Sequence, residues 1–336
     1  MSSLPSYIAR RLLQLIPVVM VIVLMTYLLM RLAPGDLVDV IAGESGSATP
    51  EYMDELRRQF NLDQSGWVIF GNYLKNLAQF DLGFSFRHGM PVADLILERV
   101  GPTLLLMLAS IVMAALLGVI LGVISARWRG SWADESISTF STIGFATPVF
   151  WVGLMLIVLF SVHLRWFPAS GMLTIGVTQD GFWSTMADLL WHLTLPALTL
   201  SLFYLSIYVR ITRAAMLEVY GLDFVRTARA KGLSELRVSV RHVLRNALLP
   251  VVTITGLQLG SLLGGSIVVE TVYSWPGLGR LAFDAVFQRD VNLLLGIFLF
   301  SSLLVVVMNL LVDLLYAVLD LSLIHISEPT RRYAIS

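Results

Sequence analysis

The sequence predicts an all-α membrane protein with six transmembrane helices, and two observations support this fold class. Hydrophobic residues make up 57% of the chain and charged residues 14%, with a mean hydropathy of +0.79, whereas an average soluble protein is roughly half apolar and a quarter charged. A helix needs about 20 mostly apolar residues to cross about 30 Å of hydrocarbon. The stretches that qualify are Leu12–Arg31, Pro102–Ser125, Ile137–Val162, His192–Ile211, Leu248–Val272 and Leu293–Leu319.

The first stretch is too long for the apolar part of a secretion signal, and no small-residue cleavage site follows it, so we expect it to remain as a span. Prolines lie inside the first, third and fourth stretches at Pro17, Pro148 and Pro196, and the fifth is rich in glycine. Neighbouring helices can satisfy the backbone groups that proline frees, and small residues let helices approach closely. We therefore expect each stretch to be one span and the fifth to be buried in the bundle.

Basic residues in short loops predict the orientation, because such loops stay in the cytoplasm. With the N-terminus inside, the cytoplasmic segments hold twelve Lys or Arg and five Asp or Glu, and the opposite side holds nine and fifteen. The sequence therefore predicts that both termini lie in the cytoplasm.

The segment 32–101, after the first span, is predicted to be a long external loop. Thr49-Pro50-Glu51 is typical of a helix start, with Leu56 and Phe60 on the apolar face. The segment Gly66–Phe80 has apolar and aromatic residues at helical spacing, which suits a membrane interface. We interpret the loop as a structural subdomain resting on the bilayer, with docking of a soluble partner as the functional alternative.

The cytoplasmic segment 212–247, between the fourth and fifth spans, is polar yet patterned. Asp223 can cap a short helix over Phe224–Lys231, and Gly232 can end it in the left-handed conformation. Ser234 can then cap a second helix. Its apolar positions are Leu236, Val240, Val243, Leu244 and Ala247, and its basic row is Arg237, Arg241 and Arg245. Taken alone, the pattern also fits a basic surface loop on anionic headgroups.

The run Thr227-Ala228-Arg229-Ala230-Lys231-Gly232, followed by Leu249-Pro250, resembles the EAA loop of permeases of binding-protein-dependent ATP-binding-cassette importers. That loop has a small-residue triplet, a glycine and a later apolar–proline pair. Thr227 stands where the family has glutamate. Further runs resemble landmarks of dipeptide, oligopeptide and nickel permeases: Arg31–Asp36, Asp81–Ser85, Pro168–Gly171, Val268–Leu281 and Leu310–Ala317.

The resemblance implies a permease subunit in a bacterial or archaeal cell (inner) membrane, with no catalytic residues of its own. Its implied partners are a second, related permease, two ATPase subunits that hold ATP and Mg²⁺, and an extracytoplasmic solute-binding protein. The implied solutes are peptides of the dipeptide or oligopeptide class, with nickel or glutathione as alternatives. The chain has no G-x-x-x-x-G-K-[ST] phosphate loop, which agrees with a nucleotide site on another chain.

The resemblance also implies two groups of site residues. Coupling to the ATPases is assigned to Asp223, Phe224, Arg226, Thr227, Ala228, Arg229, Ala230, Lys231, Gly232, Leu249 and Pro250. Ala228 and Ala230 would allow close approach to a groove, and the basic residues could pair with acidic groups at its rim. A pathway or binding-protein face is assigned to Glu270, Tyr273, Trp275, Pro276, Gly277 and Arg280.

Other chemistry has little support in the sequence. Glu270 and Asp313 lie near predicted helix ends, where structural pairing is favoured over pathway lining. The five histidines are scattered without ligand spacing and cysteine is absent, so no metal site is expected. The formal charge of zero argues against a nucleic-acid binder.

Three alternative classes remain: an ion-coupled secondary transporter, a membrane-embedded enzyme and a scaffold. The first would need several intramembrane acids and an internal repeat, the second clustered catalytic motifs, and the third does not account for the patterned segment 212–247. We expect a single transmembrane domain over 1–320. Residues 321–336 depart from the family, and Leu321–Arg331 resembles a translated transposase-type sequencing adapter.

Overall fold

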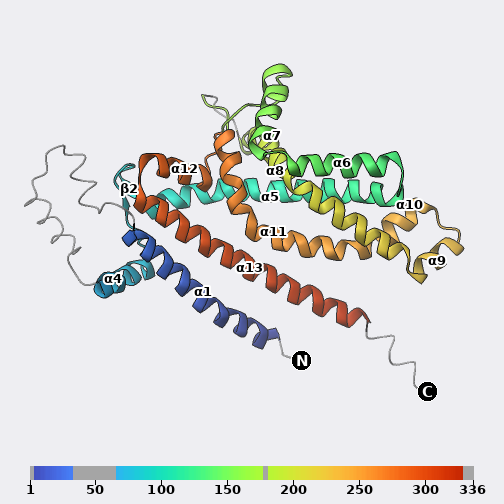
Figure 1. Cartoon of the computed structure of the whole chain (residues 1–336), viewed down its shortest axis with the longest axis horizontal. Coiled ribbons are helices and arrows are strands. Elements are labelled where there is room, and N and C mark those ends of the chain that lie inside the picture. The colour runs from blue at the N-terminus through green and yellow to red at the C-terminus, as the bar shows by residue number, and fades with distance from the viewer. Residues whose placement is uncertain (1–3, 33–65, 177–180, 328–336) are drawn as a thin grey trace, which may run out of the picture. The chain divides into compact units, whose positions relative to one another are not determined.

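The computed structural model describes residues 4–32, 66–176 and 181–327, and side chains within these ranges except at 4–12, 30, 31, 257, 259–265 and 313–327. This part of the chain is almost entirely helical (Figure 1). Its elements are α1 (Leu4–Leu32), α4 (Gly66–Ala78), β1 (Phe84–Ser85), β2 (Met90–Pro91), α5 (Val92–Arg127), α6 (Trp132–Ala146), α7 (Val149–Leu156), the π-helix η1 (Ile157–His163), α8 (Phe182–Tyr220), α9 (Asp223–Ala230), α10 (Glu235–Arg237), the π-helix η2 (Val238–Val243), α11 (Leu244–Val272), α12 (Leu278–Gln288) and α13 (Val291–Ser327).

The chain divides into two compact units. Unit 1 comprises Met1–Glu98 and Ala282–Leu304, and unit 2 comprises Arg99–Leu281 and Val305–Ser336. The helices α5, α12 and α13 contribute residues to both units.

By length and composition, several helices in the described part of the chain could cross a membrane. There, α5, α8 and the first part of α13, Val291–Val312, are long and apolar enough to cross a membrane, and α6 with α7–η1 makes a fourth candidate if that bent pair is one span. A shorter apolar helix covers Leu13–Leu29 in α1. Each of the six predicted stretches thus lies on a helix or, for the third, on a bent pair. Several helices run beyond their apolar stretch, because backbone hydrogen bonding continues into polar residues.

The third predicted stretch is not one continuous helix, because the helix breaks at Pro148. The chain bends by 107° at this break, and Thr147 has an extended backbone with φ −83° and ψ 135°. Proline has no N–H and disfavours helical geometry in the residue before it. Pro17 and Pro196, by contrast, lie inside α1 and α8 without ending them.

In unit 1, α4 packs on α1 through Tyr27. The Tyr27 hydroxyl donates a 2.6 Å hydrogen bond to the carbonyl of Gly66, and its ring lies 4.9 Å from that of Phe70. The helix predicted within Gly66–Phe80 is therefore confirmed. The helix predicted near Thr49–Phe60 lies outside the described residues.

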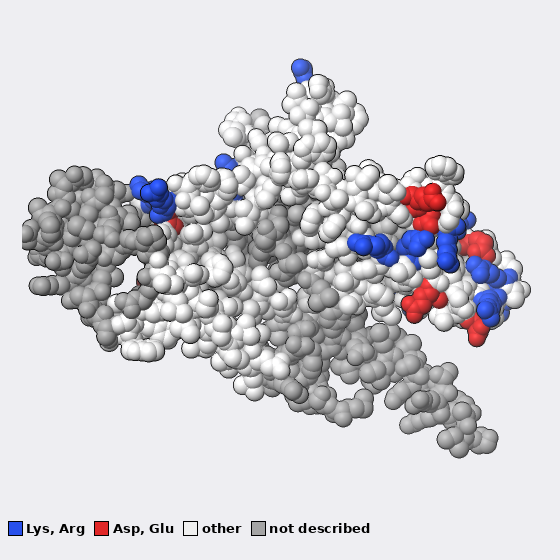
Figure 2. All heavy atoms as spheres, in the orientation of Figure 1, with Lys and Arg blue, Asp and Glu red and all other residues white. Residues whose placement is uncertain are grey.

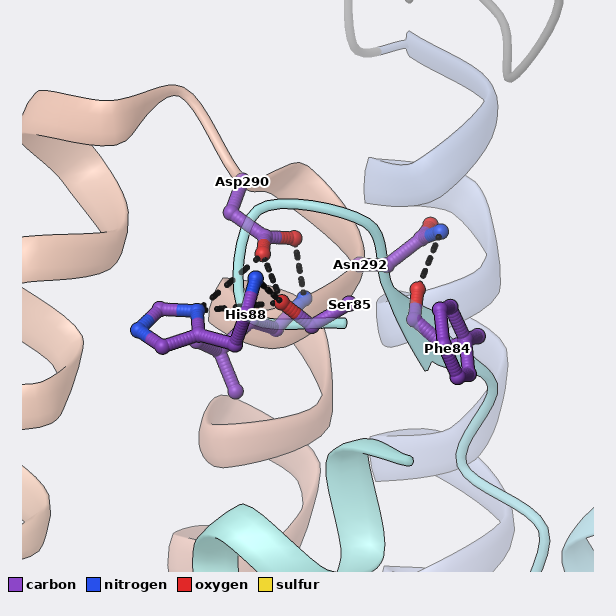
Figure 3. Close-up of polar contacts among 6 residues, drawn as sticks. Phe84, Ser85, His88, Asp290 and Asn292 are labelled. Atoms are coloured by element: carbon purple, nitrogen blue, oxygen red, sulfur yellow. Dashed lines mark hydrogen bonds and ion pairs between the residues drawn. The ribbon is translucent and has the colours of Figure 1, made fainter. Parts of the chain in front are cut away.

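The β1–β2 hairpin of unit 1 is tied to the start of α13 (Figure 3). Asp290 caps α13, since its carboxylate accepts a 3.1 Å hydrogen bond from the N–H of Leu293. The same carboxylate accepts a hydrogen bond from the Ser85 hydroxyl, and His88 Nδ1 lies 3.1 Å from that hydroxyl. Because Ser85 is fully buried, this Ser–His–Asp group is a structural clasp and not a hydrolytic triad.

In unit 2, α5 and α8 cross at very short range. A methyl group on Gly118 would lie 2.2 Å from Cβ of Tyr208, and one on Gly122 would lie 2.6 Å from Cβ of Thr212. Two glycines one turn apart thus allow the backbones to approach as small residues do in membrane bundles. Apolar side chains of α5, α8 and α11 form the core around this crossing.

Candidate functional site

The predicted coupling segment forms a short helix, α9, that ends as the sequence predicts. Gly232 has the left-handed φ of +78°. Its N–H donates to the carbonyl of Arg229 at 2.9 Å, and the N–H of Leu233 donates to that of Ala228 at 3.4 Å. This pair of bonds is the Schellman ending, which needs a left-handed residue at the position of Gly232.

The start of α9 differs from the prediction. Leu222, with an extended ψ of 148°, is the capping residue, and Asp223 is the first helical residue. The Asp223 carboxylate makes no capping bond and lies 3.4 Å from the Arg226 guanidinium on an exposed surface. It still favours the helix start, because an anion there interacts well with the helix dipole.

One face of α9 packs against the chain itself. Val225 and Ala228 are 0% and 6% exposed and join an apolar cluster with Met216, Val238 and Val243. Ala228 is therefore not available to a partner, which corrects its predicted role in close approach. The rest of α9 and its ends are open, and the exposed residues there include Leu222, Asp223, Phe224, Arg226, Thr227, Ala230 and Lys231.

Arg229 is held within the chain. Its guanidinium donates two hydrogen bonds, of 2.8 and 3.2 Å, to the carboxylate of Glu235 and lies 5.7 Å from the centre of the Tyr220 ring. The Glu235 carboxylate raises the pKa of Arg229, and the hydrogen bonds from Arg229 lower the pKa of Glu235. Beneath this pair, the Tyr220 hydroxyl lies 2.6 Å from the Ser239 hydroxyl. Arg229 thus braces the two sides of the α9 turn.

The second predicted helix is not separate from the fifth span. Ser234 holds the capping position without a side-chain bond, and helical backbone continues from α10 through η2 into α11. The π-helical turn advances the chain by five residues per hydrogen bond in place of four. As a result Val238, Val243 and Ala247 are buried, whereas Leu236 and Val240, predicted on the apolar face, are 59% and 50% exposed.

The apolar–proline pair lies further along α11. Leu249 is 45% exposed and Pro250 is also exposed. Neither residue belongs to the apolar cluster beneath α9. The structure thus brings Asp223–Gly232 together as one knob and leaves Leu249–Pro250 outside it.

An ion pair that the sequence did not predict supports this end of unit 2. Asp134 in α6 is 5% exposed, and the Arg213 guanidinium in α8 donates to each of its oxygens at 2.8 Å. The Ser125 hydroxyl and the N–H of Gly130, at 2.9 Å, also donate to it. A sequence signal existed, since Ser131-x-x-Asp134 is typical of a helix start, but the partner lies 79 residues away.

Charged side chains gather at this same end. Figure 2 shows Lys, Arg, Asp and Glu concentrated around α9, α10 and the α5–α6 turn, and a mostly uncharged surface along the neighbouring helices of unit 2. Polar ends on apolar helices are typical of a protein whose helical middle lies in lipid.

The second predicted group, Glu270–Arg280, forms the tight turn between α11 and α12. Glu270 and Trp275 are fully buried and Tyr273 is 1% exposed, so these side chains face the chain and not a soluble partner. Gly277 is buried too, and Pro276 and Arg280 are partly exposed. The side chain of Asp313 lies outside the described residues. Within the described ranges, no group of three or more His, Asp or Glu side chains is placed to hold a metal ion.

Comparison with known proteins identifies the family of this chain. Residues 118–325 match the model of the binding-protein-dependent transport system inner membrane component, and residues 4–107 match its N-terminal model. The chain is 42% identical to the oligopeptide transport system permease protein AppB of Bacillus subtilis over 316 residues, covering 94% of this chain and 98% of that protein. It is 41% identical to the glutathione transport system permease protein GsiC of Escherichia coli K12 over 315 residues, covering 94% and 97%.

The fold is similar to that of a solved transporter. The match to inward-facing conformations of the MetNI methionine ABC transporter has a TM-score of 0.51 and 18% identity, and it covers 65% of this chain and 93% of that chain. The chain therefore belongs to the family of inner membrane components of binding-protein-dependent transport systems.

Proposed function

We propose that the chain is the permease subunit of an ATP-driven importer and forms half of a translocation pathway for peptides of the dipeptide or oligopeptide class. The observation that carries the proposal is the knob Asp223–Gly232, whose open outer face lies at the charged end of a helical bundle of this family. Family membership favours an ATP-driven transporter over an ion-coupled one.

In this proposal the chain crosses a cell (inner) membrane six times with both termini in the cytoplasm, and the bent pair α6 and α7–η1 serves as the third span. The concentration of charge around α9 supports a cytoplasmic position for that end. The knob then docks in a groove of an ATPase subunit. ATP and Mg²⁺ bind on two such subunits, and a second, related permease completes the pathway.

The outer face of α9 is suited to such docking. Phe224 and Leu222 are 40% and 47% exposed and can enter an apolar pocket, as anchors do in helix-in-groove interfaces. Arg226 and Lys231 are exposed beside them and can meet acidic groups at the rim. Leu249 and Pro250 are proposed as secondary coupling positions, because both are exposed on α11.

The peptide solute is proposed from the names of the relatives, with glutathione or nickel as alternatives within the family. An extracytoplasmic binding protein would deliver it. For the turn Glu270–Arg280, the burial of Tyr273 and Trp275 favours a structural role beside the pathway, and Pro276 and Arg280 are partly exposed.

The proposal is tested with the complex of both permeases, both ATPases and the binding protein in proteoliposomes. A radiolabelled mixture of di-, tri- and pentaalanine, labelled glutathione and Ni²⁺ are offered with ATP inside or with an imposed proton gradient. We expect uptake of the alanine peptides with ATP alone. Uptake with the gradient alone would overturn the ATP-driven mechanism, and uptake only of Ni²⁺ or glutathione would overturn the solute.

The docking face has its own variant. Ala230 is exposed on the outer face of α9, so Ala230→Trp should block docking and lower ATPase copurification at least tenfold. Ala78→Trp is the matched control, because Ala78 is exposed at the end of α4. Equal copurification for the two variants would overturn the assignment of this face.

A further inference from the structure

The buried carboxylate of Glu270 is surrounded by hydrogen-bond donors. The Thr103 hydroxyl donates to it at 2.8 Å and the N–H of Arg280 at 3.0 Å. The Ser266 hydroxyl also donates to it. A carboxylate accepts at both oxygens, whereas a glutamine side chain would turn its NH₂ toward one of these donors.

This carboxylate caps the next helix along the chain, α12. Arg280 lies in the first turn of α12, which begins at Leu278, and the N–H groups there have no partners within the helix. Negative charge at a helix start also interacts favourably with the helix dipole. The N–H of Leu278 donates at 2.7 Å to the Thr103 hydroxyl, which in turn donates to Glu270. Thr103 thus links α5 to both α11 and α12.

The backbone closes tightly around the same group. A methyl group on Gly277 would lie 2.4 Å from the carboxyl carbon of Glu270, and one on Gly279 would lie 2.6 Å from Cα of Ile267. Nearby, Trp275 Nε1 donates to the carbonyl of Pro102 at 2.9 Å. The Tyr273 hydroxyl donates to the carbonyl of Gly153 at 3.1 Å. The end of α11 is therefore fastened to α5 and α7.

The knob lies at the other end of the long helix that includes α11, which we call the rod. Helical backbone is continuous from Glu235 to Val272, which corresponds to roughly 55 Å at 1.5 Å per residue. One end lies directly after α9, and the other is held by Glu270. A displacement at the knob must therefore appear as tilting or bending of this rod, provided that the far end stays in place.

We propose that Glu270 is a positioning residue that makes this end of α11 the fixed pivot of the transport movement. The inference rests on the proposed function of α9 as the site of ATPase coupling. Thr103 and the first turn of α12 are the groups through which the Glu270 carboxylate acts. Without the hydrogen bonds of Glu270, this end of α11 moves when the ATPases displace the knob. Less solute is then transported for each ATP hydrolysed.

The first test measures alanine peptides taken up per ATP hydrolysed in the reconstituted complex. Thr103→Val removes the hydroxyl at nearly constant volume, and we expect at least a tenfold lower ratio with ATP hydrolysis within twofold of the unmodified complex. Thr103→Ser keeps the hydroxyl and should restore the ratio to within twofold. Glu270→Gln should behave as Thr103→Val does, and Glu270→Asp should retain part of the ratio.

Two outcomes would overturn the pivot. One is an equal fall in uptake and in ATP hydrolysis for Thr103→Val, which would show that Thr103 only stabilises the fold. The other is an unchanged ratio in both Thr103→Val and Glu270→Gln. In each case normal ATP-driven uptake by the unmodified complex leaves the proposed function standing, and absence of that uptake is the separate failure of the proposed function.

The second test uses spin labels, which is practical because the chain has no cysteine. Cysteines at Leu108 and Val268, which are 47% and 38% exposed, report on the held end, and cysteines at Trp132 and Leu236, which are 86% and 59% exposed, report on the knob end. With ATP and Mg²⁺, the distance between the labels at positions 108 and 268 (the first distance) should stay constant. The distance between the labels at positions 132 and 236 (the second distance) should shift. Thr103→Val should broaden the first distance, and a shift of both distances by equal amounts in the unmodified complex would overturn the pivot.

Discussion

Arg213 donates two parallel hydrogen bonds of 2.8 Å to the two carboxylate oxygens of Asp134, and this fork joins α8 to α6. The carboxylate is 5% exposed and is also bonded to Ser125 and Gly130. Without Arg213, Asp134 would be a buried charge with no compensating partner, whereas the Arg213 side chain is 31% exposed. The knob extends from the same helix as Arg213, directly after α8 ends.

Removing the Asp134 carboxylate should therefore destabilise the chain strongly. For Asp134→Ala we expect a loss of about 1.5–3 kcal/mol in the free energy of unfolding, because Ser125, Gly130 and the Arg213 guanidinium, whose side chain is 31% exposed, lose their charged acceptor. Asp223→Ala is the matched control, since Asp223 pairs with Arg226 on an exposed surface, and should cost less than about 0.5 kcal/mol. Thermal unfolding in detergent, followed by circular dichroism, measures both, and equal shifts for the two variants would contradict this ranking.

The brace between Arg229 and Glu235 should depend on pH. The hydrogen bonds from Arg229 lower the pKa of Glu235 below its usual 4.5, so the stabilisation is present above pH 4.5 and is lost as the pH falls through the lowered value. Hydrogen exchange of the α9 amides should speed up in that acid range. Glu235→Gln should exchange fast at neutral pH and show no such transition, and a transition that persists in Glu235→Gln would assign it to another group.

Gly232 should tolerate asparagine better than alanine. Its φ of +78° is left-handed and nothing lies within 4 Å of the position that a methyl group would occupy, so strain and not a clash sets the effect. We expect Gly232→Ala to cost about 1–2 kcal/mol, and Gly232→Asn less, because asparagine visits this conformation readily. Gly221→Ala is the control, since Gly221 has a φ of −76°. Comparable unfolding temperatures for Gly232→Ala and Gly221→Ala would contradict the argument.

At Ser274, replacement by glycine should stabilise the chain. Ser274 ends α11 with a φ of +51°, and the N–H of Trp275 donates to the carbonyl of Glu270 at 2.8 Å as in the ending of α9. Glycine adopts this conformation without steric cost. Ser274→Gly should therefore raise the free energy of unfolding by about 1 kcal/mol, and a lower unfolding temperature would show that the serine side chain stabilises the turn.

The crossing of α5 and α8 should be intolerant of one added methyl group. Gly122→Ala would place a carbon 2.6 Å from Cβ of Thr212, so the helices must separate, at about 1–3 kcal/mol for overpacking. Gly71→Ala is the control, because a methyl group on Gly71 in α4 would have no side chain or other segment within 4 Å. Unfolding temperatures in detergent measure the difference, and the prediction is wrong if Gly122→Ala is as stable as the control.

The local pattern predicted several elements because its causes are local. Apolar runs of membrane-crossing length marked the long helices, and the aromatic spacing of Gly66–Phe80 marked α4. Gly232 marked the end of α9, because the left-handed conformation is a property of that residue and its neighbours. The break at Pro148 was present in the sequence as well, but the choice between a tolerated proline and a broken helix depends on what packs around it.

The amino-acid sequence is thus sufficient to predict an apolar, helical chain of this family and the position of its knob. Which faces are free depends on how the helices pack. The π-helical turn at Val238–Val243 exposes Leu236 and Val240, and packing buries Ala228, Tyr273 and Trp275. Asp134 meets Arg213 and Glu270 meets Thr103 across 79 and 167 residues. Periodicity describes neighbours within one helix, whereas burial and ion pairing depend on which helices meet.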